Sequence, residues 1–143
     1  MQLFRPGTHK ALVVLGKLQV TSHLDIMGVA GQDVALPCHI TSTEPLDILE
    51  VQWVKIIDWK TEGVHKYTKL AEDWPGEKYQ GCTNLLRDGF TLGNMSLLLR
   101  GIQPADDGKY SFIVLSNKGA REITTMLNVA GEDFRAKLCR QGV

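Results

Sequence analysis

The sequence predicts an all-β sandwich, and three observations support this prediction. Apolar residues alternate with other residues over short runs, turn residues separate these runs, and no stretch of ten or more residues has the period of an amphipathic helix. The clearest alternating runs are Val34–Ile40, Leu49–Lys55, Met95–Leu99, Lys109–Leu115 and Ile123–Val129. Short strands separated by regular turns are typical of two packed sheets.

Each run carries one face that we expect to be buried. The side chains expected to point inward are, in chain order, Val34, Leu36, Cys38 and Ile40; Leu49, Val51 and Trp53; Met95, Leu97 and Leu99; Tyr110, Phe112 and Val114; and Ile123, Thr125, Leu127 and Val129. Between the last two runs, Asn117–Gly119 predicts a short hairpin loop with the glycine at a positive φ. Pro104 and Gly108 limit the segment before Tyr110 to one helical turn.

Charge and cysteine content exclude several classes of function. The chain has 143 residues, enough for one domain, and 16 Lys and Arg residues balance 16 Asp and Glu residues. This balance gives no electrostatic attraction to nucleic acid or to an anionic membrane. The three cysteines, Cys38, Cys82 and Cys139, and the four histidines lack the spacing of metal ligands or of a nucleophile with its base. We therefore expect no catalytic residues, no metal, no cofactor and no small-molecule substrate.

The two ends of the chain differ from the alternating middle. Residues 1–20 are expected to be a leader or an irregular segment, because the apolar run Ala11–Gly16 is shorter than the core of a secretory signal. Neither a signal peptide nor a membrane span is evident. We expect one domain over residues 21–131 and a flexible tail over residues 132–143.

Three signature positions resemble those of a variable-type immunoglobulin domain. Cys38 lies on one strand, Trp53 lies 15 residues later on the next strong strand, and Asp106, Gly108 and Tyr110 form a D-x-G-x-Y motif. More closely, the chain resembles the butyrophilin and myelin-oligodendrocyte-glycoprotein group. The matching segments are "GQDVALPC" at Gly31–Cys38, "LEVQW" at Leu49–Trp53, the stretch Tyr79–Phe112 and "VAG" at Val129–Gly131. The resemblance covers about residues 21–131 and implies a variable-type immunoglobulin β-sandwich.

Two departures from the family pattern affect how such a sandwich is held together. Phe112 stands where the family has its second cysteine, so the usual inter-sheet disulfide to Cys38 cannot form. Cys82 stands where the family has an arginine that pairs with Asp106. Losing the disulfide lowers the free energy of unfolding by about 4.5 kcal/mol in the chain-entropy model. Burial of Phe112 against Trp53 raises it again by about 1.5–3 kcal/mol. We expect reduced stability and a buried free thiol at Cys38, with a Cys38–Cys82 bridge as the less favoured alternative.

The side chains between the inward positions form a candidate binding face. By the resemblance, the runs Leu49–Lys55, Lys109–Leu115 and Ile123–Val129 are strands C, F and G. On these strands we expect an outward, exposed and largely apolar patch of the kind that marks protein interfaces, formed by Gln52, Val54, Ile113, Leu115 and Met126. The alternative is that flanking loops cover this patch. Separately, Asn94 begins the sequence Asn-Met-Ser, an acceptor for N-linked glycosylation.

The resemblance implies a non-enzymatic recognition domain on the extracellular side of the plasma membrane, or secreted, that regulates T-cell receptor signalling and cytokine production. Its partner would be a protein receptor on T cells or a second immunoglobulin domain, with a homodimer as one form. Two other interpretations stay open: a truncated or decayed family member without a surface function, and another immunoglobulin-family adhesion or receptor module.

Overall fold

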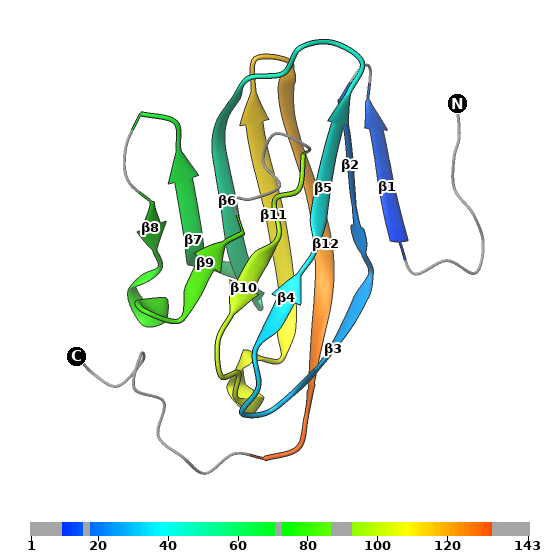
Figure 1. Cartoon of the computed structure of the whole chain (residues 1–143). Helices are drawn as coiled ribbons and strands as arrows, with labels where there is room; N and C mark the ends of the chain where they lie inside the picture. The colour runs from blue at the N-terminus through cyan, green and yellow to red at the C-terminus, as the bar shows by residue number, and fades with distance from the viewer. Residues whose placement is uncertain (1–9, 16–17, 71–72, 87–92, 133–143) are drawn as a thin grey trace.

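The chain forms two facing layers of β-strands, and the alternating pattern of the sequence explains both. The computed structural model describes residues 10–15, 18–70, 73–86 and 93–132. In one layer, a six-stranded sheet has the spatial order β3 (Asp25–Val29), β12 (Gly119–Ala130), β11 (Gly108–Ser116), β6 (Ile48–Ile57), β7 (Lys60–Thr68) and β8 (Trp74–Pro75). The predicted all-β sandwich is confirmed (Figure 1).

Two three-stranded sheets make up the facing layer. One contains, in spatial order, β1 (Lys10–Leu15), β2 (Leu18–His23) and β5 (Cys38–Ser42), and the other contains β4 (Val34–Leu36), β10 (Leu97–Leu99) and β9 (Thr83–Leu85). Short 3₁₀ turns occur at Glu77–Tyr79 and Pro104–Asp106. The second of these is the single helical turn that Pro104 and Gly108 were expected to allow.

The core lies between the layers and is centred on three aromatic side chains. Trp53, Tyr110 and Phe112 are all 0% exposed. Phe112 pairs across the sheet with Trp53 on one side and with Ile123 on the other. Cross-strand partners point to the same face. The inward apolar residues of β6, β11 and β12 therefore pack in one core.

The predicted strand over residues 34–40 is broken at Pro37. Its first part, β4, pairs with β10, whereas its second part, β5, pairs with β2. Proline has no backbone N–H and cannot donate to a ladder, which suits Pro37 to the point where the strand changes partners. The inward face is kept, because Leu36, Cys38 and Ile40 are all buried.

The sandwich includes residues that were assigned to the N-terminal segment. A strand, β1, lies within residues 1–20 and forms an antiparallel hairpin with β2, which itself starts at Leu18. After β2 the chain crosses to the other layer, where β3 runs parallel to β12. The expected tail beyond residue 132 lies outside the described residues.

Two local predictions concern the hairpin after β11 and the start of β6. The hairpin between β11 and β12 is confirmed: Ser116 pairs with Gly119, and Gly119 has a φ of 117°. Leu49 was expected to point into the core, but it is 38% exposed. The pairing of β6 with β11 is irregular at this residue, because Leu115 pairs with Glu50 and the next residue, Ser116, pairs with Ile48, and it is Ile48 that packs against the core.

Candidate protein-binding face

The outward side chains of β6, β11 and β12 form one surface, which we call the G–F–C face. Phe112 points into the core, so its neighbours on β11, Ser111 and Ile113, point outward. In register with them, Ser111 pairs with Val54 and Ile113 pairs with Gln52. The strand register therefore brings the outward residues predicted on three separate strands onto one surface.

The structure corrects the expectation for Val54, which is only 6% exposed. Its neighbour Ser111 is 0% exposed and donates a hydrogen bond to the carboxylate of Glu122. On the other side, Val54 pairs with Gly63, over which the ring of Trp74 lies. Because side chains of the same sheet cover the centre of the face, Val54 has little surface to offer to a partner.

The accessible apolar side chains lie around this covered centre. Leu115 is 44% exposed, whereas Ile113 and Met126 are half-buried. Two further side chains extend the same face: Met27 on β3 is 70% exposed, and Trp74 on β8 is 48% exposed. Met27 pairs with Asn128 and Trp74 pairs with Lys66, so the apolar surface reaches both outer strands of the six-stranded sheet.

Sequence reasoning missed Met27, which is followed by the turn-type residue Gly28, and Trp74, whose strand is short. The strand β8 has only two residues, and Trp74 lies within a turn signal of Trp, Pro and Gly. A large apolar residue in a turn could have served as a signal, because turns are normally exposed.

Charged residues accompany the apolar side chains. Lys66 Nζ lies 3.7 Å from Glu50 Oε1, and both side chains are about one third exposed. Glu122 and Lys109 also point outward and are exposed. Accessible apolar side chains accompanied by charged residues are typical of a protein interface.

Behind the face, Phe112 takes the position between the sheets that the missing disulfide would use. The ring centroids of Trp53 and Phe112 are 5.2 Å apart, and the ring planes are tilted by 56°. Cys38 is a free, buried thiol. Burial raises the pKa of this thiol far above its usual range, and a backbone hydrogen bond at His39 lowers it only in part. Cys38 therefore behaves as a small apolar side chain.

The 3₁₀ turn Pro104–Asp106 forms a corner next to the G–F–C face, and this corner has a contact that the sequence did not suggest. Lys55 is 8% exposed, its Nζ donates a 2.6 Å hydrogen bond to the carbonyl oxygen of Ala105, and it lies 5.7 Å from the centre of the Tyr110 ring. Tyr110 in turn donates to the carbonyl oxygen of Asp106. Lys55 is thus a cation that contacts this corner from β6.

Asp106 and Asp107 act as structural acceptors in the same corner. Asp106 Oδ2 accepts a hydrogen bond from the backbone N–H of Gln103, which closes a capping box, and Asp107 Oδ2 accepts one from the N–H of Val129. These two bonds tie the 3₁₀ turn to its own start and to β12. The two carboxylates thus have a structural role in closing this turn.

One buried polar group resembles a hydrolytic triad in composition. His65 Nδ1 lies 3.0 Å from Thr83 Oγ1, and His65 Nε2 lies 2.9 Å from Asp73 Oδ2. His65 is 3% exposed and Thr83 is 7% exposed, so the hydroxyl is closed off from substrate. The group links β7, β9 and the residue before β8, which is a structural role. Among the described residues, no group of three or more His, Cys, Asp or Glu side chains could hold a metal ion.

The fold and its signature residues define a variable-type immunoglobulin domain. A family model described as immunoglobulin V-set domain matches residues 21–129. The chain belongs to the immunoglobulin V-set family.

Three comparisons place the chain more closely. Human butyrophilin subfamily 1 member A1 is 29% identical over 105 residues, which cover 73% of this chain and 20% of that protein. The mouse V-set domain containing T-cell activation inhibitor 1 is 30% identical over 98 residues, covering 64% of this chain and 32% of that protein. The IgV-like domain of human B7-H4 superposes with a TM-score of 0.67 at 25% identity, over 78% of this chain and 96% of that domain.

The resemblance to the butyrophilin and myelin-oligodendrocyte-glycoprotein group is confirmed, because proteins of both names are among the relatives. This is a cell-surface, immune-related family. The chain spans about one fifth of the length of its butyrophilin relative. Within the described part of the chain there is no helix with the length and apolar character needed to cross a membrane.

Proposed function

We propose that this domain is a non-enzymatic recognition module at the cell surface that binds a protein partner through its G–F–C face. The observation that carries the proposal is the apolar surface formed by Ile113, Leu115 and Met126 and extended by Met27 and Trp74. Exposed apolar groups gathered on one face are more typical of an interface than of a fully solvated surface. Gln52, half-buried beside Ile113, would supply a polar contact within the interface.

We further propose that the partner is a receptor on T cells or a second immunoglobulin domain, including a second copy of this chain, and that binding regulates T-cell receptor signalling and cytokine output. Support comes from the butyrophilin relatives and from the relative whose name describes a T-cell activation inhibitor. Because the centre of the G–F–C face is covered, a partner would contact mainly the apolar side chains around that centre.

Ile113→Glu is the variant that tests this function. The change places a charge among the apolar side chains of the proposed interface, where an unpaired buried charge is strongly unfavourable. We expect loss of binding of fluorescent tetramers of the domain to activated T cells, and loss of any self-association measured by sedimentation. Leu98→Glu is a matched control, because Leu98 is a half-buried leucine on the outward side of β10, in the opposite layer.

Both variants are first compared with the unmodified chain by circular dichroism and thermal unfolding. Binding that survives Ile113→Glu in a folded domain would rule out the G–F–C face as the interface. Absence of the unmodified chain from the cell surface and the medium would favour a decayed family member instead.

A further inference from the structure

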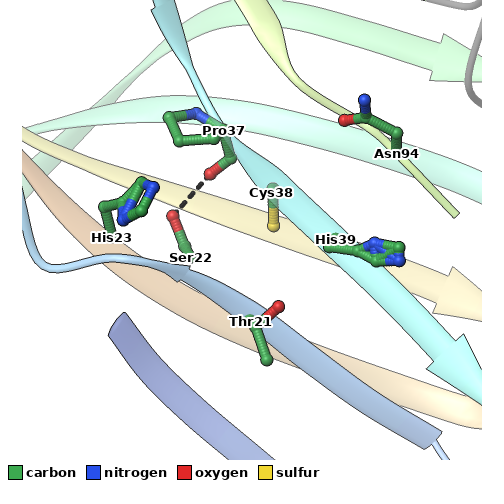
Figure 2. A pocket seen from close by; sticks show the side chains of 7 residues that line it. All are labelled: Thr21, Ser22, His23, Pro37, Cys38, His39 and Asn94. Carbon is green, nitrogen blue, oxygen red and sulfur yellow. Dashed lines mark hydrogen bonds between the residues drawn. The ribbon is translucent and has the colours of Figure 1, made fainter. Parts of the chain in front are cut away.

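A pocket lies in the layer opposite the G–F–C face. It has a volume of about 240 Å³, and its wall includes Thr21 and Ser22 from β2, Cys38 and His39 from β5, and Asn94 (Figure 2). Ser22 and Cys38 are buried, so the accessible groups among these five are the side chains of Thr21, His39 and Asn94.

Strand pairing places these three accessible side chains in one row across the sheet. Thr21 pairs with His39 on β2 and β5, and His39 forms an isolated antiparallel bridge with Asn94. Cross-strand partners have neighbouring side chains on one face. Cys38 and Ile40 point inward, so His39 and the rest of the row point outward.

On β2 and β5, polar side chains flank the row. The outward residues beside it on these two strands are Gln19, His23 and Thr41. Thr41 Oγ1 donates a hydrogen bond to Gln19 Oε1 within this surface. Hydroxyl, amide and imidazole groups suit a hydroxyl-rich ligand such as a sugar better than the apolar anchors of a protein partner.

Asn94 also begins the acceptor sequence Asn94-Met95-Ser96. Its side chain is exposed, and Ser96 Oγ donates a 2.8 Å hydrogen bond to Asn94 Oδ1. This bond uses the amide oxygen of Asn94. The amide nitrogen, to which an N-linked sugar is attached, takes no part in it.

We propose that Asn94 carries an N-linked glycan whose first N-acetylglucosamine lies in this pocket against His39 and Thr21. The inference rests on the proposed function, because a chain acquires such a glycan only in the secretory pathway. In the transfer, C1 of the sugar leaves the pyrophosphate of a lipid-linked oligosaccharide and bonds to Asn94 Nδ2. The amide loses one proton, and the lipid pyrophosphate departs. The glycan would cover the polar layer and leave the G–F–C face to the partner.

Attachment is tested with the full chain, secreted from cultured mammalian cells behind a cleavable leader. We expect a band that loses mass after treatment with peptide-N-glycosidase, and loss of this shift in Asn94→Gln. Asn84→Gln is the matched control, because Asn84 is an exposed asparagine on β9 outside any acceptor sequence, and it should keep the shift. A folded, secreted chain without the shift would overturn this inference and leave the proposed function standing. Failure of secretion would count against both.

Seating of the sugar in the pocket is tested by NMR on the glycosylated chain. We expect nuclear Overhauser effects between the first sugar and the imidazole protons of His39. We also expect slower enzymatic release of the glycan from the folded chain than from the unfolded chain. In His39→Ala, release from the folded chain should become several-fold faster, whereas Thr41→Ala, on the same surface but outside the pocket wall, should leave it unchanged. A glycan with no such Overhauser effects and with equal release rates would overturn the pocket assignment.

Discussion

Trp53 and Phe112 face each other across neighbouring strands of the six-stranded sheet, with ring centroids 5.2 Å apart. Phe112 follows Tyr110 by two residues, which is the position of the second cysteine in the immunoglobulin signature, while Cys38 in the opposite layer is a free thiol. A tilted aromatic pair gains about 0.5–1.5 kcal/mol beyond the burial of its area. In this domain, aromatic packing stabilises the region that a covalent bridge would otherwise link.

Truncating the ring should therefore be costly. We expect Phe112→Ala to lower the free energy of unfolding by about 3–5 kcal/mol, because it leaves a cavity beside Trp53. The measurement is urea unfolding followed by Trp fluorescence. Val114→Ala, on the same strand and equally buried, removes a smaller group and should cost less. A loss under about 1 kcal/mol for Phe112→Ala would contradict this packing role.

The buried Lys55 should matter more than an exposed lysine beside it. Lys55→Met removes the donor to the Ala105 carbonyl, and we expect a loss of about 1–3 kcal/mol in the free energy of unfolding. Lys109→Met is the control, because Lys109 is exposed on the adjacent strand and should change the free energy by less than about 0.5 kcal/mol. Equal effects of the two substitutions would show that the Lys55 contact contributes nothing.

The thiol of Cys38 should make stability depend on pH on the alkaline side. Burial raises the folded-state pKa of Cys38 above its ordinary value of 9.0, so the folded protein favours the protonated thiol. The contribution of Cys38 to the free energy of unfolding is then complete below pH 9.0 and decreases as the pH rises above it. Urea unfolding between pH 7 and pH 10, compared with Cys38→Ala, measures the difference. Identical pH profiles for the two chains would refute this prediction.

Trp74 should contribute to binding, although its strand has only two residues. We expect Trp74→Ala to weaken T-cell staining by domain tetramers about tenfold or more, as large aromatic anchors do at interfaces. Trp59→Ala is a matched control, because Trp59 is 85% exposed at the turn between β6 and β7, away from the centre of the face. If only Trp59→Ala reduced staining, the interface would lie at that turn instead.

The sequence was most informative where alternation is long. The runs around Trp53, Phe112 and Leu127 each located a strand and most of its buried face, because a period of two determines which side chains point inward. The strands that were missed, such as β7 over Lys60–Thr68 and β9 over Thr83–Leu85, are polar or very short, so their pattern carries little signal. The break at Pro37 also escaped prediction, because it depends on which neighbour each half of the strand pairs with.

The candidate face was predicted in orientation but not in exposure. Register placed Val54 on the outer face, as alternation requires, yet its exposed fraction depends on residues of other strands, such as Trp74, whose ring lies over the paired Gly63. The burial of Lys55 was not predicted, because a lysine in a buried position is uncommon. Its contact was not predicted either, because the acceptor, the Ala105 carbonyl, is 50 residues away along the chain. Such contacts are set by tertiary structure and have no local pattern.

A double-mutant cycle between Trp53 and Phe112 tests most directly whether this aromatic pair stabilises the sandwich in the absence of the disulfide. Trp53→Leu, Phe112→Leu and the double variant are unfolded in urea under reducing conditions, and their free energies of unfolding are compared with that of the unmodified chain. A coupling of about 0.5–1.5 kcal/mol between the two substitutions is the predicted result. Additivity within about 0.3 kcal/mol would contradict it.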